Sequence, residues 1–257
     1  MLCGDVINIL DNQSPKEYAL EWDNVGLLVG RKDKKIKKIL VAVDGTLEVI
    51  NEAIQGEYDM IVTHHPMIFS KLKKINDDTV LGQKILSLIQ HDICCFAMHT
   101  NFDTIGGMGK LAAKMLGLIN VEILEETIDG EGIGCVGMLG ATQTVEELAG
   151  IVKDKFGLKN VILYGNTGEK VDKVAICPGS GKSVIEVAYK KGASCLVTGD
   201  IGHHDGIDAV EMGLNIIDAS HYGIEKIFME YMCSYLREHC LGVQVDIADT
   251  KEPFIIL

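Results

Sequence analysis

The sequence predicts an α/β protein made of two similar three-layer lobes. Short apolar runs alternate with amphipathic segments along the 257 residues, as in strand–helix–strand units whose strands run parallel. A second observation is a weak internal repeat, which aligns residues 38–63 with residues 173–198. A third is the hydrophobic content of 47%, which supplies enough core for two lobes.

The first half begins with a helix, because apolar residues recur at helical spacing over residues 3–12 and Ser14-Pro15 ends the pattern. An apolar strand then closes at Val29-Gly30. The next segments, predicted from their apolar patterns, are a strand over Ile39–Val43, a helix over Leu47–Gln55, a strand over Asp59–Thr63, a helix over 80–90, a strand over Ile93–Met98 and a helix over Leu111–Leu116.

The second half repeats the strand–helix–strand order. Thr144 and Glu147 form a capping box that starts its first helix. The elements that follow are a strand over Val174–Cys177, a helix over Ser183–Lys190, a strand over Cys195–Thr198, a helix, a strand over Asn215–Ile217, a long helix from about 221 to 238 and two short closing strands.

The glycine-rich stretch 131–140 is the best place for the chain to change lobe. We therefore expect an N-terminal lobe over residues 1–128 and a C-terminal lobe over residues 129–257. The lobe against which the C-terminal helix packs is left open. In the internal repeat His65 aligns with Asp200, so the second copy keeps the architecture and changes the chemistry.

Polar side chains gather where three predicted strands end. Since ligands of open α/β sheets bind at the carboxyl ends of the strands, these residues are candidates for a site. Imidazole and carboxylate together suit a borderline or hard divalent ion such as Zn, Mn or Fe(II), and a carboxylate can bridge two ions. The three clusters are His64-His65, His99 with Asp103, and His221 with Glu225.

Charge and cysteine usage exclude several classes of protein. A net charge of −13 argues against sequence-independent binding to nucleic acid, which needs a basic surface. No apolar run is long enough to span a membrane, and the N-terminus lacks the pattern of a signal peptide. The eight cysteines are scattered without a C-x-x-C pair, as in reduced core thiols. We expect a cytoplasmic protein.

Two further motifs each have two interpretations. Residues 177–183 look like half a phosphate-binding loop, but Ile176 stands where that motif needs glycine. A tight turn is therefore the better interpretation, and a turn whose backbone N–H groups bind an anion is the alternative. His203-His204-Asp205 with Asp200 is either a separate metal site or part of the lining of the main one.

The sequence resembles the type 2 GTP cyclohydrolase 1 homologues, also called the NIF-three-like family, along essentially its whole length. The resemblance rests on several motifs that are specific only in combination. They are Trp22-Asp-Asn-Val-Gly-Leu27, Thr63-His-His-Pro66 with Phe69, His99-Thr-Asn-Phe-Asp103, Gly179-Ser-Gly181, Thr198-Gly-Asp200 and His221-Tyr-Gly-Ile-Glu225.

The resemblance implies a dinuclear metal site in the cleft between the lobes, holding two divalent ions (Zn, Fe or Mn) per chain. His65 and Asp103 would hold one ion, His64 and His221 the other, and Glu225 would bridge them. The family also implies a toroidal homohexamer with its sites facing an internal cavity.

Two functions remain open from the sequence. The first is a metal-dependent hydrolase of a nucleotide such as GTP, with His99 as proton carrier. Its candidate substrate-binding residues are Asp23, Lys71, Asp200 and His204. The second is a non-catalytic, hexameric protein with a regulatory or metal-handling role.

Overall fold

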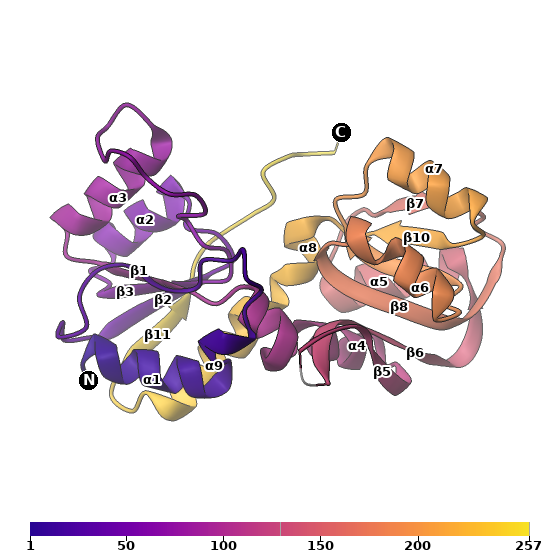
Figure 1. The fold of residues 1–257 in the computed structure, drawn as a ribbon, viewed down its shortest axis with the longest axis horizontal. Coiled ribbons are helices and arrows are strands. Elements are labelled where there is room, and N and C mark those ends of the chain that lie inside the picture. The colour runs from indigo at the N-terminus through magenta and orange to yellow at the C-terminus, as the bar shows by residue number, and fades with distance from the viewer. Residues whose placement is uncertain (129, 257) are drawn as a thin grey trace. The chain divides into compact units, whose positions relative to one another are not determined.

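The computed structural model describes residues 1–128 and 130–256 and divides into two compact units (Figure 1). Unit 1 comprises residues 1–106 and 228–251, and unit 2 comprises residues 107–227 and those from Glu252 onward. The units therefore differ from the division at residue 128 expected from the sequence, and Asp129 lies outside the described residues. None of the described helices combines the length and the apolarity that crossing a bilayer requires.

Unit 1 contains a five-stranded sheet in the order β1-β4-β3-β2-β11. Its strands are β1 (Gly26–Val29), β2 (Lys38–Ala42), β3 (Met60–Thr63), β4 (Cys94–Ala97) and β11 (Gln244–Ile247). Its helical segments are α1 (Cys3–Gln13), α2 (Leu47–Gln55), α3 (Val80–Gln90), α9 (Ile227–His239) and the short turns η1 (Lys16–Tyr18) and η2 (Phe102–Gly106).

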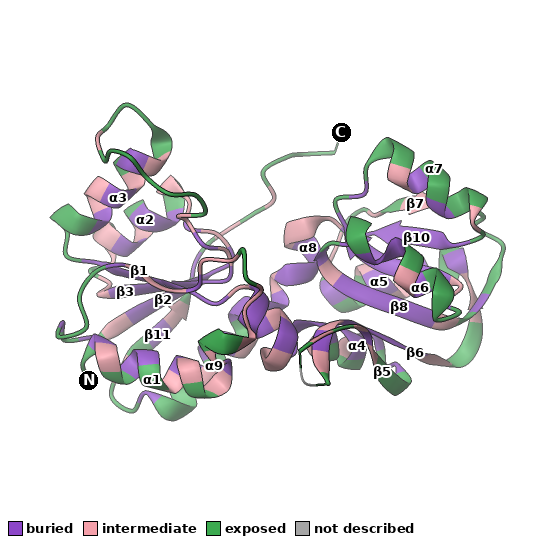
Figure 2. Ribbon diagram, in the orientation of Figure 1, coloured by how far each residue is buried: buried purple, intermediate pink, exposed green. Residues whose placement is uncertain are grey.

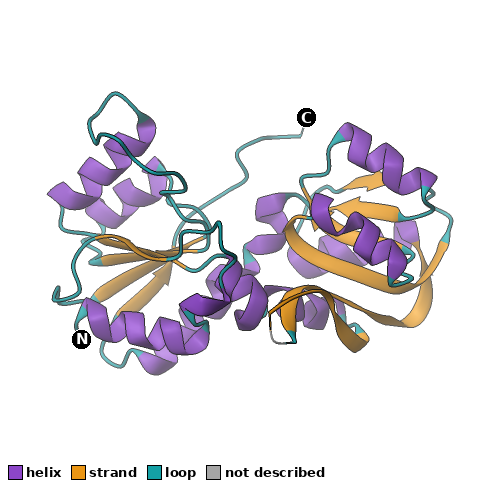
Figure 3. Ribbon diagram, viewed as in Figure 1, coloured by secondary structure: helices purple, strands orange, loops and turns teal. Residues whose placement is uncertain are grey.

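Helices cover both faces of this sheet, α2 and α3 on one and α1 and α9 on the other (Figures 1 and 3). All four residues of β3 are buried, as expected for a parallel strand enclosed on two faces. Leu40 and Ala42 of β2 join the core under α2 and α3, together with Ile61 of β3. The parallel strand–helix–strand unit predicted from the sequence is confirmed here.

Unit 2 contains a six-stranded sheet in the order β5-β6-β8-β9-β10-β7. Its strands are β5 (Ile119–Ile128), β6 (Glu131–Thr144), β7 (Ile162–Tyr164), β8 (Lys170–Ser180), β9 (Cys195–Gly199) and β10 (Asn215–Asp218). Its helices are α4 (Met108–Leu116), α5 (Val145–Phe156), η3 (Lys182–Val184), α6 (Ile185–Lys190), α7 (His203–Glu211) and α8 (His221–Glu225).

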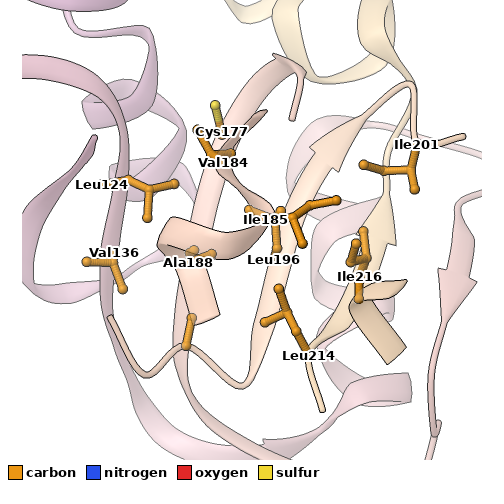
Figure 4. Close-up of a cluster of buried hydrophobic side chains, with 13 residues drawn as sticks. Leu124, Val136, Cys177, Val184, Ile185, Ala188, Leu196, Ile201, Leu214 and Ile216 are labelled. Carbon is orange, nitrogen blue, oxygen red and sulfur yellow. The ribbon is translucent and has the colours of Figure 1, made fainter. Parts of the chain in front are cut away.

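A buried cluster joins α6 to the sheet of unit 2. Ile185 and Ala188 of the helix pack over Leu196 of β9 and Ile216 of β10 (Figure 4). The predicted capping box is confirmed, since Thr144 accepts from the backbone of Glu147, whose carboxylate accepts from the backbone of Thr144. Burial follows this layering, with exposed residues on the outer helix faces and loops (Figure 2).

The two sheets share a topology. In unit 1 the parallel strands β2, β3 and β4 are followed by the antiparallel edge strand β1, and in unit 2 the parallel strands β8, β9 and β10 are followed by the antiparallel β7. In both units the edge strand precedes the three parallel strands in the sequence. This common order supports the internal duplication that the weak repeat indicates.

Three sequence-based expectations about elements were wrong. The glycine-rich stretch 131–140 forms part of β6, inside the sheet of unit 2, and does not link lobes. The long helix is divided at Lys226 into α8 and α9. Only one closing strand, β11, is found in the described residues.

The eight cysteines all lie within the described residues, and each is buried as a thiol. We expect a water-soluble disulfide reagent to label native protein only slowly and to titrate eight thiols after unfolding in urea, because buried thiols react only when the chain opens. A colorimetric thiol assay measures both values. Fewer than eight thiols in unfolded, unreduced protein would mean that disulfides are present.

Candidate metal centre

Three imidazoles lie together at the carboxyl edge of the unit 1 sheet. His64 and His65 directly follow β3, and His99 follows β4, which pairs with β3 so that Thr63 lies opposite Ala97. One ring nitrogen of each histidine lies within 4.8 Å of one nitrogen of each of the others. The parallel pairing of the strands therefore brings together residues from two sequence motifs.

The partner of each Nδ1 atom fixes the orientation of its ring. Nδ1 of His64 lies 2.8 Å from the carbonyl oxygen of Met98, and because a carbonyl only accepts, this nitrogen carries the proton. Nδ1 of His65 lies 2.8 Å from Oδ1 of Asp44, and a carboxylate selects the same tautomer. In this tautomer Nε2 carries the lone pair, as in histidines that bind metals.

His99 is held in the same way by Asp23, whose Oδ1 lies 2.9 Å from Nδ1. The Asp23 side chain is fully enclosed and also accepts from the backbone and hydroxyl of Thr100. Burial opposes its charged form, but the hydrogen bonds from His99 and Thr100 outweigh burial and lower the pKa of Asp23 to about 2. Asp23 is therefore a carboxylate near neutral pH and keeps His99 in place.

Asp103 adds an oxygen donor to this group. It lies on η2, and its Oδ1 is 3.6 Å from Nε2 of His64. The His64 ring is fully buried and packs against Phe228, with ring centroids 5.2 Å apart. Imidazole nitrogens with a carboxylate beside them are the donor types that a borderline divalent cation prefers. The hydrogen bonds at Nδ1 hold the rings as they are held in metal sites.

Unit 2 holds a second imidazole–carboxylate pair on α8. Nε2 of His221 lies 3.1 Å from Oε2 of Glu225, four residues further along the helix, and Nδ1 lies 2.7 Å from Oδ2 of Asp200. Glu225 is almost completely buried. Asp200 therefore orients His221 as Asp44 orients His65. Asp200, which the sequence predicted to bind substrate, contacts a histidine in the structure.

Gly179 leaves room for the His221–Glu225 pair. It has a φ of +81°, and a Cβ atom at this position would lie 2.5 Å from Oε1 of Glu225 and 3.7 Å from Nε2 of His221. We expect Gly179→Ala to destabilise unit 2 by roughly 1–3 kcal/mol, through backbone strain and displacement of Glu225. Urea unfolding measures the loss, and Gly192→Ala, also at positive φ but in open space, separates the strain from the displacement. Equal losses in the two variants would contradict the contact.

The remaining predicted residues have more peripheral positions. Lys71 is exposed in the loop after Phe69. His204 lies on α7 edge-on to His203, at 5.2 Å, and Asp205 of that cluster forms an ion pair with Lys182 at 3.0 Å. Where the sequence predicts a tight turn, Gly179 and Ser180 belong to β8, and a Cβ at the next residue, Gly181, would overlap Oγ1 of Thr198.

Sequence reasoning missed the role of Asp44. This residue follows β2, whose end lies beside the end of β3. The rule that singled out His64 and His65, a polar side chain after a parallel strand, applies to Asp44 as well and is the signal that finds it.

Comparisons with known proteins agree with this fold. Residues 1–253 match the family model described as Duf34/NIF3 (NGG1p interacting factor 3). A protein of Clostridium perfringens named GTP cyclohydrolase 1 type 2 homolog is 41% identical over 255 residues, which cover 98% of this chain and 97% of the relative. Its namesake from Clostridium acetobutylicum is 36% identical, over 95% and 93% of the two chains.

Among solved structures, a Bacillus cereus protein related to NIF3 superposes with a TM-score of 0.94 at 26% identity, covering 100% of this chain and 99% of that one. The match by sequence spans nearly the whole chain, and the structural match includes both sheets. The chain therefore belongs to the Duf34/NIF3 family.

Proposed function

We propose that this protein is a divalent-metal-dependent hydrolase that acts on a nucleotide. The observation that supports it most is the group of His64, His65 and His99, each with its Nδ1 bound to a polar partner. The exposed His91 also has its Nδ1 beside a backbone carbonyl, so what distinguishes the three is that their ring nitrogens lie within 4.8 Å of one another. Such a group suits two metal-binding imidazoles with a third beside them that exchanges protons.

The proposed ligand set is the one implied by the family resemblance, with two divalent ions (Zn, Fe or Mn) per chain. It consists of His64, His65, Asp103, His221 and Glu225. Ions held by such donors supply Lewis acidity and bring the pKa of coordinated water toward neutrality. Asp44 and Asp200 orient His65 and His221, so we expect both to increase metal affinity.

We assign proton transfer to His99. Asp23 fixes its tautomer and stabilises the imidazolium that forms when Nε2 takes up a proton. Because the Asp23 carboxylate is enclosed and bonded to His99 and Thr100, we assign it to positioning and not to direct contact with substrate. Lys71 is placed on an exposed loop, where it can meet phosphate groups.

We expect His99→Gln to keep its bound metal and to lose activity by roughly a hundredfold or more, since general acid–base groups contribute about 10²–10⁴-fold. Metal analysis and initial rates on the same preparation measure the two effects. Loss of metal together with activity would make His99 a ligand and would contradict the assignment.

The names of the relatives support GTP as the first substrate to test. In the reaction assigned to the family, C8 of guanine is attacked, the imidazole ring opens and formate is released. The experiment is metal-dependent formate release from GTP by the purified protein, with Asp103→Ala and Glu225→Ala as inactive variants. Metal-loaded protein that turns over no nucleotide or phosphoester would instead favour a metal-handling or regulatory role.

We also propose that the protein assembles into a homohexamer, as the family resemblance implies. Light scattering on the eluting protein tests this, with six times the 28.0 kDa chain mass as the expected value. A mass of one or two chains would contradict it.

A further inference from the structure

We propose that Trp22 and Phe69 form a stacking platform for a planar heteroaromatic ring, which belongs to a small molecule bound beside the imidazole cluster. The identification of that molecule as the substrate rests on the proposed function. The platform itself rests on geometry within unit 1.

Two large apolar rings stand exposed next to each other. Trp22 is 57% exposed and Phe69 is 53% exposed, and their ring centroids lie 5.6 Å apart with 36° between the planes. Exposed aromatic pairs keep apolar area in contact with water, which is unfavourable until another ring covers them. Such a pair is typical of sites that bind flat, partly apolar ligands.

The platform borders the candidate metal centre. His99 stands edge-on to both rings, at 5.9 Å and 73° from Trp22 and at 6.2 Å and 69° from Phe69. A ligand ring stacked on the pair would therefore lie next to one of the three clustered imidazoles. This adjacency favours a reacting small molecule over a protein partner as the occupant.

Hydrogen bonds hold the two loops in this arrangement. Nδ2 of Asn24 donates to the carbonyl oxygen of Ile68 at 2.6 Å, which ties the Trp22 loop to the residue before Phe69. The backbone N–H of Leu20 donates to Oγ1 of Thr100 at 2.9 Å, on the segment that carries His99. The rings are thus positioned before a ligand binds, which lowers the entropic cost of stacking.

The surroundings favour a ring that carries anionic groups. Lys71 and Lys73 are exposed on the loop that follows Phe69. Each presents an ammonium group on a flexible stem that can reach a phosphate attached to a stacked base. The ligand class that fits both features is a nucleoside phosphate, with stacking providing affinity for any base.

Trp22 is the only tryptophan of the chain, so its fluorescence reports directly on the platform. The test is a titration of metal-stripped protein with guanosine and adenosine monophosphates and with ribose 5-phosphate, corrected for absorption by the base. We expect saturable quenching by both purine nucleotides and none by ribose 5-phosphate. Absence of saturable quenching, or equal quenching by the sugar phosphate, would overturn the proposal.

Variants at Phe69 test the second ring. We expect Phe69→Ala to weaken nucleotide binding about tenfold, because alanine removes one of the two stacking rings. Phe69→Tyr should preserve binding, because tyrosine keeps an aromatic ring at this position. Phe254→Ala is the matched control, since Phe254 is 52% exposed and belongs to unit 2. Unchanged affinity in Phe69→Ala, with native circular dichroism, would refute the platform.

The hydrolase assignment and the stacking platform can be refuted independently of each other. Quenching is measured without metal, so a protein that stacks nucleotides but releases no formate would retain the platform and lose the hydrolase assignment. Conversely, a metal-loaded and active protein whose nucleotide affinity is the same in Phe69→Ala would retain the function and lose the platform.

Discussion

Protein carrying His65→Ala is expected to bind divalent metal at least a hundredfold more weakly than the wild type. Removing the group that accepts a hydrogen bond from the other ring nitrogen of a metal-binding histidine weakens metal affinity about 10–100-fold. Removing the imidazole itself takes away a ligand, so the loss is larger. The His65 side chain is 21% exposed, so the variant should fold. Titration calorimetry with Zn²⁺ measures the change.

Two further variants make this result specific. Asp44→Ala removes only the carboxylate that lies 2.8 Å from Nδ1 of His65 and should weaken binding about 10–100-fold. His91→Ala removes an exposed histidine at the end of α3, outside the cluster, and should leave affinity unchanged. Equal affinity in His65→Ala and His91→Ala would show that metal binds elsewhere.

Phe228→Ala is expected to lower the free energy of unfolding of unit 1 by about 3–5 kcal/mol, the usual range for a buried phenylalanine. The Phe228 ring is fully buried and meets His64 at 5.2 Å and Phe102 at 5.1 Å, edge-on to the latter. Its removal leaves a cavity behind His64, so metal affinity should fall as well. Urea unfolding followed by fluorescence of Trp22 reports on this unit.

The comparison variant for this position is Phe228→Leu, which keeps most of the volume and should lose less than about 1.5 kcal/mol. Phe254→Ala, at an exposed position, should change the stability of unit 1 by less than about 0.5 kcal/mol. A loss below about 1 kcal/mol in Phe228→Ala would mean that the site does not depend on this packing.

Periodicity predicted most strands and helices of this protein. The strands β3, β4, β9 and β10 are short, fully buried runs, which an apolar pattern reveals. α2 was predicted with its observed ends, Leu47 and Gln55. The membership of the compact units was not predictable in this way, because it depends on β11 pairing with β2, a contact between distant segments that no local pattern encodes. The same holds for β6, whose glycines resemble a linker.

The candidate site was predictable in part for a related physical reason. Polar residues after buried strands identified His64, His65 and His99 as neighbours, and the sheet order places β3 and β4 side by side. Their outer partners were harder to foresee. The acceptor for His64 is a backbone carbonyl, that of Met98, which sequence patterns do not reveal, and Asp23 reaches His99 from a distant loop.

The metal content of protein purified without chelators or added metal tests the central claim most directly. Elemental analysis of the wild type should give two divalent ions per chain, and His65→Ala and Glu225→Ala should each contain fewer. Wild-type protein that contains no divalent metal and binds none on addition of Zn, Fe or Mn would contradict the account.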